Sequence, residues 1–413
     1  MPVDVPLNAP TRQARLARAA VAALFLTNGA VFFNVVPRYP QIKADLDLSN
    51  ATLGVALAAF PLGALLAGLL AAAAIRRFRS SRVAALGIVL LAATTLAIPV
   101  APNWIVFAAV LFVVGALDSI IDVAQNAHGL RVQRLYGRSI LNSLHGVWSI
   151  GAVLGGLMGA AAAGLRIPLA VHLGVSAALF SLIALVAYRF LLPGPEDAER
   201  PAEAQNLAAA DGHAAAPPAR GEGRRAFTGA AVRMLAALGV LAACGALVED
   251  AGASWGAIYL SDDLHADAAT AGLAVVALQT AMTVGRLTGD RVVDRFGPRA
   301  VTRAGGLLAA LGMGAALAVP SVGTALAGFA LAGLGVATLV PAAMHAADEL
   351  PGLPPGTGLT IVSWLLRGGF LLSPPLVGFV SDLTSLRIGL LSVVLAGVTT
   401  ALLARTLTNR TSA

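Results

Sequence analysis

The chain alternates between long apolar segments and short polar stretches. An α-helix of about 20 apolar residues crosses the hydrocarbon core of a bilayer, so each long apolar segment predicts a transmembrane helix. The segments lie near residues 18–37, 51–75, 83–101, 104–128, 139–164, 168–191, 232–260, 267–290, 300–319, 322–347, 357–381 and 386–407. We therefore expect an all-α membrane protein with twelve transmembrane helices.

The twelve predicted helices fall into two groups of six. Residues 192–231 mix Pro, Ala, Gly and charges of both signs without a helical period, which is typical of a linker. The segments "RRFRSSRVAALG" from Arg76 and "DRFGPRAVTRAG" from Asp294 occupy the same place in each group, 218 residues apart. We expect an N-terminal half at 1–191 and a C-terminal half at 232–413, related as parallel repeats like those of many secondary transporters.

Composition narrows the class of protein. The 413 residues are 58% hydrophobic and 12% charged, and the charged share is about half that of a soluble globular protein. The single cysteine, Cys244, permits no internal disulfide and no thiolate cluster. The sequence therefore argues against a soluble enzyme, and we expect no metal or other cofactor.

The positive charge indicates membrane topology rather than nucleic-acid binding. The net charge is +7, and nearly all the cationic residues are arginines in short loops near span ends, the pattern that orients a membrane protein. Arginine-rich stretches precede the first span, join spans 2 and 3 and join spans 4 and 5: Arg12, Arg15, Arg18, Arg76, Arg77, Arg79, Arg82, Arg131, Arg134 and Arg138. The loops on the other side hold only Arg38, Lys43, Arg166 and Arg387. We expect both termini in the cytoplasm, and the family resemblance described below implies a bacterial inner membrane.

Polar residues inside the fourth span are the strongest functional candidates. An ionisable residue at the centre of a span costs roughly 2.5–3.5 kcal/mol on insertion scales, so it is a candidate for function. Asp118, Asp122 and Asn126 recur every four residues and therefore share one helical face. His145 lies at a similar predicted depth in the next span. We predict that Asp122 and His145 handle a proton and that Asp118 and Asn126 contact a solute; the alternative is that the two aspartates only hold helices together.

The second half carries its own buried charges. Glu249 and Asp250 are adjacent in span 7, and because neighbouring helical residues point about 100° apart, at most one of them faces the pathway directly. Arg367 in span 11 needs a counter-charge, either a carboxylate across the cavity or one on the solute. The remaining candidates for the cavity are Asn28, Trp148 and Gln279.

Arg38 closes the first span in "NVVPRYPQI". A terminal arginine usually extends its charged end to the membrane interface. We expect Arg38 either to do so or to gate the mouth of the cavity by pairing with an acidic residue, and we favour these roles over contact with the solute.

The segment "GDRVVDRFGPR", from Gly289 to Arg299, resembles the loop motif between spans 2 and 3 of a half in the major facilitator superfamily. The matching residues are Asp294, Arg295, Gly297 and Arg299. The resemblance implies a charge latch at the cytoplasmic face that breaks and reforms during alternating access. The first-half copy departs from the motif, because Arg76 stands at the Asp position and Arg79 at the Gly position.

A narrower resemblance involves spans 4 and 5. "DVAQNA" from Asp122 and "GRSILNSLHGVWSIGAVLGG" from Gly137 are similar to the fucose-permease-like bacterial branch and its uncharacterised inner-membrane relatives. The resemblance implies that Asp122 takes part in proton and sugar handling, with Asn126 following it. The carboxylate that this branch carries in span 1 has no counterpart here, where Asn34 and Val36 lie in its vicinity.

These observations favour a monomeric secondary transporter with a central cavity. Its expected partners are a small polar solute such as a sugar or related metabolite, protons and the lipid bilayer, with no nucleic acid. The alternative is proton-coupled efflux of an amphipathic metabolite or drug. A membrane enzyme or a metal transporter is disfavoured because no ligand motif such as HExxH is present.

Overall fold

The computed structural model describes residues 11–137, 139–194, 196, 229–350 and 356–407. The described residues form helices and no strands, and twelve helical stretches are long and apolar enough to cross a membrane. The prediction of an all-α protein with twelve transmembrane helices is confirmed. Most of the predicted linker at 192–231 lies outside the described residues.

The first six spans occupy residues 12–188. They comprise α1 (Arg12–Val35) continued by η1 (Val36–Arg38) and α2 (Tyr39–Asp45), α3 (Asn50–Ala67) continued by η2 (Gly68–Leu70) and α4 (Ala71–Phe78), α5 (Ser80–Thr95) with η3 (Ile98–Val100), α6 (Trp104–Tyr136), α7 (Leu141–Gly164) and α8 (Leu169–Tyr188). Side chains that accept hydrogen bonds from the first turn mark several helix starts, among them Thr11, Ser49 and Asn103.

The last six spans begin at residue 229. They comprise α10 (Gly229–Ile258) with η4 (Tyr259–Asp263), α11 (Ala268–Phe296), α12 (Pro298–Ala318), α13 (Val322–Val336) with α14 (Leu339–Asp348), α15 (Thr357–Leu383), and α16 (Leu386–Gly389) with α17 (Leu391–Leu403) and η5 (Ala404–Thr406). Several helices run past their predicted ends: α6 reaches Tyr136 and α11 reaches Phe296.

Glycines in span 5 let two helices of the first half approach closely. A Cβ atom on Gly151 would meet the Leu26 backbone, and one on Gly155 would meet the Ala30 backbone. Glycine is therefore required along the contact of α7 with α1, as in other close helix contacts in membranes.

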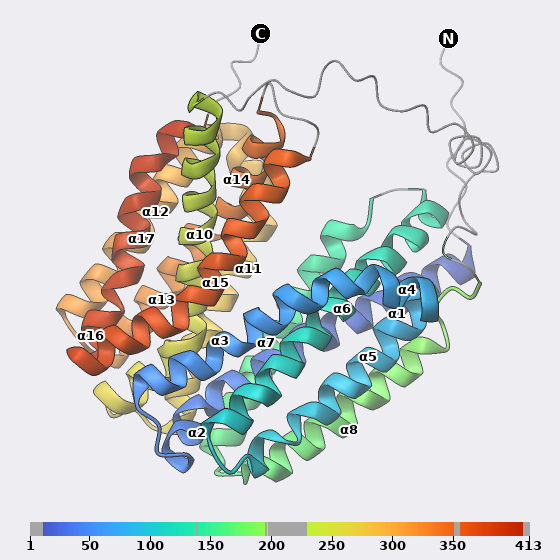
Figure 1. The fold of residues 1–413 in the computed structure, drawn as a ribbon, viewed down its shortest axis with the longest axis horizontal. Coiled ribbons are helices and arrows are strands. Elements are labelled where there is room, and N and C mark those ends of the chain that lie inside the picture. Colours follow the sequence, from blue (N-terminus) through green and yellow to red (C-terminus); the bar gives the residue numbers. More distant parts are fainter. Residues whose placement is uncertain (1–10, 138, 195, 197–228, 351–355, 408–413) are drawn as a thin grey trace.

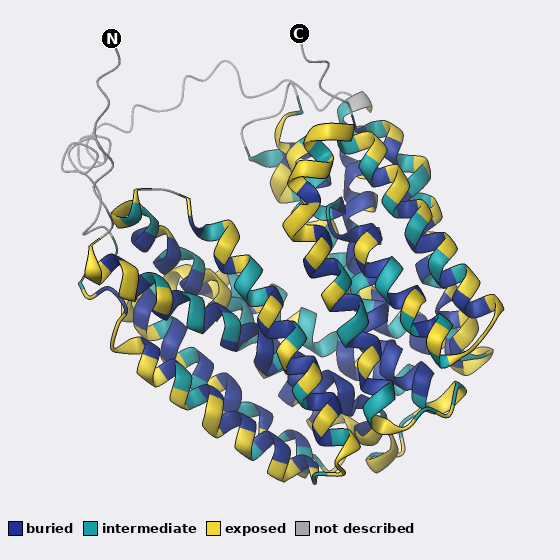
Figure 2. Cartoon of the chain, turned by 180° about the vertical axis from the view of Figure 1, so that it is seen from behind, coloured by how far each residue is buried: buried dark blue, intermediate teal, exposed yellow. Residues whose placement is uncertain are grey.

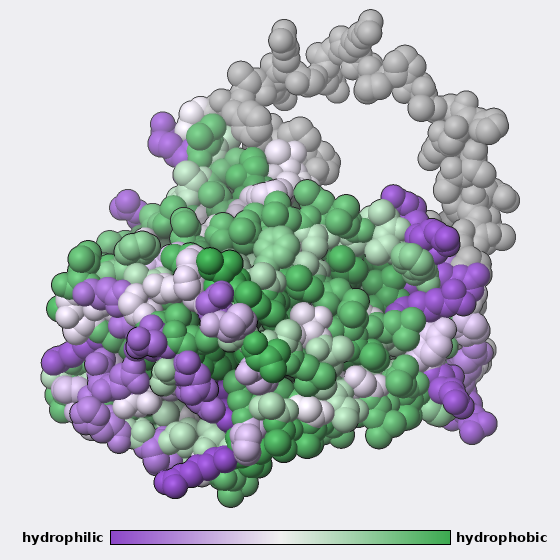
Figure 3. Space-filling view, turned by 60° about the horizontal axis from the view of Figure 1, so that its bottom comes forward, coloured by the Kyte–Doolittle hydropathy of each residue, from purple (hydrophilic) through white to green (hydrophobic). Residues whose placement is uncertain are grey.

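The two halves meet at one end and diverge toward the other (Figure 1). They touch along α3 and α15 and along α7 and α11. We call the end that holds α2, η4 and α16 the closed end, and the end where both chain termini lie the open end. Buried residues fill each bundle and exposed ones lie mostly on its outside (Figure 2). A broad apolar surface separates hydrophilic groups (Figure 3), which suits a chain surrounded by lipid.

Candidate functional site

Three of the predicted cavity residues form one hydrogen-bonded chain on the first half. The Asn28 amide nitrogen donates to Asp118 Oδ1 at 3.1 Å, and Trp148 Nε1 donates to Asn28 Oδ1 at 3.1 Å. These residues come from α6, α1 and α7, so the contacts tie three helices together. Asn28 is buried while Asp118 is half-buried, which places the carboxylate at the edge of the bundle.

Asp122 lies one turn further along α6 and is exposed. Asn126 donates from its amide nitrogen to Asp122 Oδ1 at 3.0 Å and to the Asp122 carbonyl at 2.9 Å. His145 on α7 and Arg367 on α15 both interact electrostatically with Asp122. The structure therefore brings together the two residues predicted to handle a proton and adds a cation from the other half.

The orientation of the His145 ring leaves one nitrogen available. Its Nδ1 lies 3.1 Å from the Leu141 carbonyl, and because a carbonyl only accepts, this nitrogen carries hydrogen in that contact. The Phe25 ring meets the imidazole edge to face, with centroids 5.3 Å apart. The side chain is exposed, and Nε2 takes no part in this contact.

Arg367 reaches from α15 toward the first half. Its Nη1 lies 3.9 Å from the position that a Cβ atom on Gly68 would occupy, a position that is also 3.0 Å from Ser119 Oγ. Asp122, across the space between the halves, is a carboxylate on which Arg367 acts electrostatically, although the two form no ion pair among the described residues. Arg367 and His145 are 222 residues apart in matching "LRGGF" and "LHGVW" segments, so they occupy equivalent places in the two repeats.

Glu249 pairs with Arg286, a residue that the sequence reasoning missed. Arg286 Nη2 lies 3.2 Å from Glu249 Oε2, joining α11 to α10. The predicted span 8 ended at residue 290, which placed Arg286 almost at the helix end. Because α11 continues to Phe296, Arg286 lies well inside the helix, and its pairing with Glu249 explains how both charges are accommodated.

Asp250 turns away from Glu249, as expected for adjacent helical residues. Ser254 Oγ donates to Asp250 Oδ1 at 3.2 Å, and Oδ2 is buried without a hydrogen-bond partner among the described residues. Gln279 is 1% exposed, and neither of its amide atoms has a partner in the described part of the chain. Gln279 therefore does not face the space between the halves in this conformation.

The two copies of the loop between spans 2 and 3 share one backbone conformation. Gly297 has φ 81° and ψ 152°, and Arg79, which stands at the glycine position of the first copy, has φ 73° and ψ 148°. Arg295 stacks over the Phe296 ring. Asp294 is exposed, and within the described residues it forms no hydrogen bond or ion pair, so the predicted latch is not closed in this conformation.

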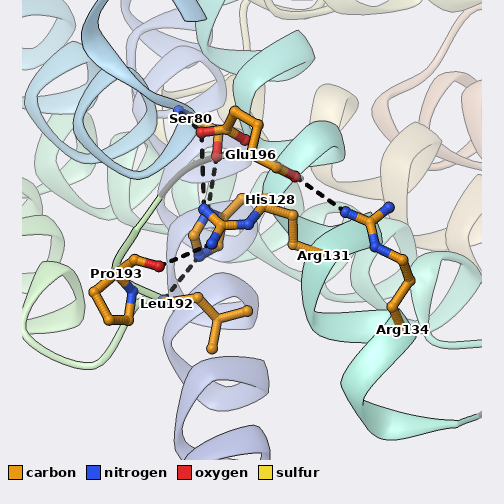
Figure 4. Close-up of polar contacts among 7 residues, drawn as sticks. All are labelled: Ser80, His128, Arg131, Arg134, Leu192, Pro193 and Glu196. Carbon is orange, nitrogen blue, oxygen red and sulfur yellow. Dashed lines mark hydrogen bonds and ion pairs between the residues drawn. The ribbon is translucent and has the colours of Figure 1, made fainter. Parts of the chain in front are cut away.

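A glutamate from beyond span 6 occupies the start of α5 in the first half (Figure 4). Glu196 Oε1 accepts from the Ser80 backbone at 2.8 Å and lies 3.7 Å from Arg131 Nη1. His128 bridges the Ser80 hydroxyl at 2.9 Å and the Leu192 backbone N–H at 3.1 Å. The first copy of the motif lacks its aspartate, and Glu196 supplies a carboxylate at the positive end of this helix instead.

The closed end is held by charged contacts between the halves. Lys43 Nζ lies 2.7 Å from Asp262 Oδ2. The Asp382 carboxylate, at the end of α15, accepts from the backbone N–H groups of Asn50 and Ala51, each at 2.9 Å. Asp382 therefore caps the first turn of α3 from the opposite half, a contact that the sequence reasoning did not identify.

The prediction that Arg38 extends to the interface or pairs with an acidic residue is wrong. Its side chain is 2% exposed, and among the described residues it forms no ion pair. It donates to the Gln41 side chain and to the Ile167 carbonyl. The packing of η1 against the turn after α7 draws this arginine inside the protein.

Comparison with known proteins assigns the architecture. A sequence profile of the Major Facilitator Superfamily matches residues 21–249 and again residues 238–413. This chain belongs to the major facilitator superfamily. Membrane protein MosC of Rhizobium meliloti is 31% identical over 384 residues, which cover 93% of this chain and 88% of MosC.

Solved transporter structures share the fold. The nucleoside transporter NupG superposes with a TM-score of 0.70 at 14% identity and covers 96% of this chain and 98% of its own. An inward-facing, unoccupied bacterial homologue of the lysosomal transporter Spinster has a TM-score of 0.70 at 18% identity, with coverage of 96% and 98%. FucP in the outward conformation has a TM-score of 0.59 at 17% identity, with coverage of 95% and 99%. The chain is therefore a multi-pass membrane transporter of this superfamily.

Proposed function

We propose that the transporter moves a small polar solute, such as a sugar or related metabolite, by alternating access, and that a proton bound by Asp122 drives the movement. The observation that carries the proposal is the position of Asp122. It is an exposed carboxylate inside a span, and both His145 and Arg367 of the other half act on it electrostatically. A carboxylate is costly at this depth, and its charge state depends strongly on the cations beside it.

Protonation of Asp122 links the proton to the movement of the halves. While ionised, Asp122 attracts Arg367 across the space between α6 and α15. A proton received through Nε2 of His145 removes that attraction and leaves Arg367 free to bind an oxygen of the solute. The chain from Trp148 through Asn28 to Asp118 then offers further polar contacts, and Glu249 with Arg286 offers a second charged pair.

We propose that the open end faces the cytoplasm and that this conformation is inward-open. The arginine-rich loops support this orientation through the positive-inside rule. The higher TM-score to the inward-facing Spinster homologue than to outward FucP agrees with it. In the opposite conformation, the contacts of Lys43 and Asp382 at the closed end separate and the latch at Asp294 forms.

The replacement Asp122→Asn tests the proton step. Asparagine keeps the size and hydrogen-bonding capacity of the side chain but cannot ionise. A thermal-stability screen of the purified protein against sugars, sugar acids, nucleosides and dyes first identifies a solute. In proteoliposomes, we expect accumulation of that solute under an imposed pH gradient to fall to background in Asp122→Asn, whereas exchange of preloaded solute continues.

Asp348→Asn is the matched control, because Asp348 is an exposed carboxylate at the end of α14, away from the central residues. It should transport like the parent protein. Gradient-driven accumulation that survives in Asp122→Asn would contradict the proton role of this residue. Vesicles loaded from either side distinguish uptake from export.

A further inference from the structure

A small pocket lies between the halves at the closed end, away from the central residues. Its volume is about 310 Å³, near the lower limit for a small-molecule site. Its described lining includes Arg38, Gln41, Arg166 and Ile167 from the first half and Ser261 and Ala268 from the second. Because both halves contribute, the pocket exists only while the closed end is closed.

Arg38 lines this pocket, and the described lining contains no acidic residue beside it. Arg38 is almost completely buried, with 2% of its surface exposed. Its Nε and Nη2 donate to Gln41, and Nη2 also donates to the Ile167 carbonyl at 2.8 Å, but Nη1 is buried with no partner among the described residues. A buried, incompletely bonded cation is costly and requires an explanation.

Three carboxylates near this end have hydrogen-bond or ion-pair partners of their own. Asp45 accepts from Gln41 Nε2 at 3.3 Å, so it acts on Arg38 only through that amide and at longer range. Asp262 pairs with Lys43, and Asp267 accepts from the first turn of its own helix, α11. The described pocket lining has two arginines and no acidic residue.

We propose that this pocket binds an oxyanion, a carboxylate or a phosphate group, that pairs with Arg38. Guanidinium groups favour such ligands because their planar donors match two oxygens of one anion. The anion supplies the missing counter-charge and contacts both halves. If the halves alternate as proposed above, an anion bound here stabilises the conformation in which the closed end is closed.

Binding is tested on the purified full chain with inorganic phosphate, measured as thermal stability at constant ionic strength against chloride. We expect a saturable rise of about 2 °C in the apparent Tm. Arg38→Gln removes the cation and should abolish the rise. Arg387→Gln removes an arginine that donates to the Ala318 carbonyl elsewhere and should keep it.

A second variant keeps the proposal testable if Arg38→Gln fails to fold. Ala268 is exposed at the first position of α11, where an acidic residue favours the helix. Ala268→Glu places a carboxylate in the pocket, so it should fold normally and lose the response to phosphate. This test measures binding alone, and its result does not depend on whether Asp122 carries a proton.

A second experiment distinguishes a free anion from a lipid headgroup as the ligand. Nanodiscs of phosphatidylglycerol and of phosphatidylcholine replace detergent, and phosphate is titrated again. A response to phosphate in both lipids identifies a free solute as the ligand. A stability gain from phosphatidylglycerol that is lost in Ala268→Glu identifies a lipid headgroup. No saturable gain in either arm, or an equal gain in Arg38→Gln and Ala268→Glu, overturns the proposal.

Discussion

Arg79 adopts a backbone conformation that residues with a Cβ atom rarely occupy. At φ 73° and ψ 148° it lies near a region used almost only by glycine, and such a conformation costs of order 1–3 kcal/mol. The second repeat places Gly297 at the same position with nearly the same angles. Both repeats therefore form the same turn. The first half carries arginine at the position where glycine suits the backbone conformation better.

The replacement Arg79→Gly should stabilise the protein. Removing the Cβ relieves strain that exceeds the extra chain entropy of glycine, so we expect a gain of about 1 kcal/mol. Thermal unfolding of the purified protein measures it. Gly297→Ala is the reciprocal control and should lower the Tm, and a Tm that falls in Arg79→Gly would show that the Arg79 side chain makes a larger contribution than its backbone strain.

At the scale of elements, α3 depends on α15 for its first turn. The carboxylate of Asp382 caps Asn50 and Ala51 from the other half, so the cap is lost whenever the closed end opens. A helix cap contributes about 1 kcal/mol. If the halves alternate as proposed, Asp382 contributes to the balance between conformations as well as to the stability of one helix.

The replacement Asp382→Asn should shift that balance toward opening of the closed end. A loss of about 1 kcal/mol raises the population of the opened form about five-fold. Spin labels at Ala44→Cys and Leu383→Cys in a Cys244→Ser background report the distance across the closed end, and the longer distances should become more populated. Asp267→Ala removes a cap that lies within one half, so an equal shift in that variant would contradict the cross-half role.

The sequence predicted the helices well and the contacts between halves poorly. Span lengths, the stripe of Asp118 and Asp122 and the small residues of α7 depend on local periodicity, which a sequence displays directly. The Asp382 cap joins residues more than 330 positions apart and exists in only one arrangement of the halves. No local pattern encodes such a contact. The burial of Arg38 could not be predicted for the same reason, because it depends on contact with the turn after α7, which is distant in sequence.

At the scale of the whole molecule, the two ends differ in their charged contacts. Asp382 holds the closed end in this conformation, whereas Asp294 at the open end is exposed and, in the described part of the chain, unpaired. If Asp294 forms its latch only in the opposite conformation, each aspartate stabilises a different state. The energies of two distant sites usually add, so the effects of removing them should oppose each other.

The double variant Asp382→Asn/Asp294→Asn tests this opposition with the same spin labels. Asp294→Asn alone should reduce the population with long distances at the closed end, because it destabilises the opposite state. Combined with Asp382→Asn, it should return the distribution close to that of the parent protein, since the two changes act on opposite sides of one equilibrium. If both single variants shift the distances in the same direction, the aspartates do not stabilise different states, and the latch at Asp294 has another role.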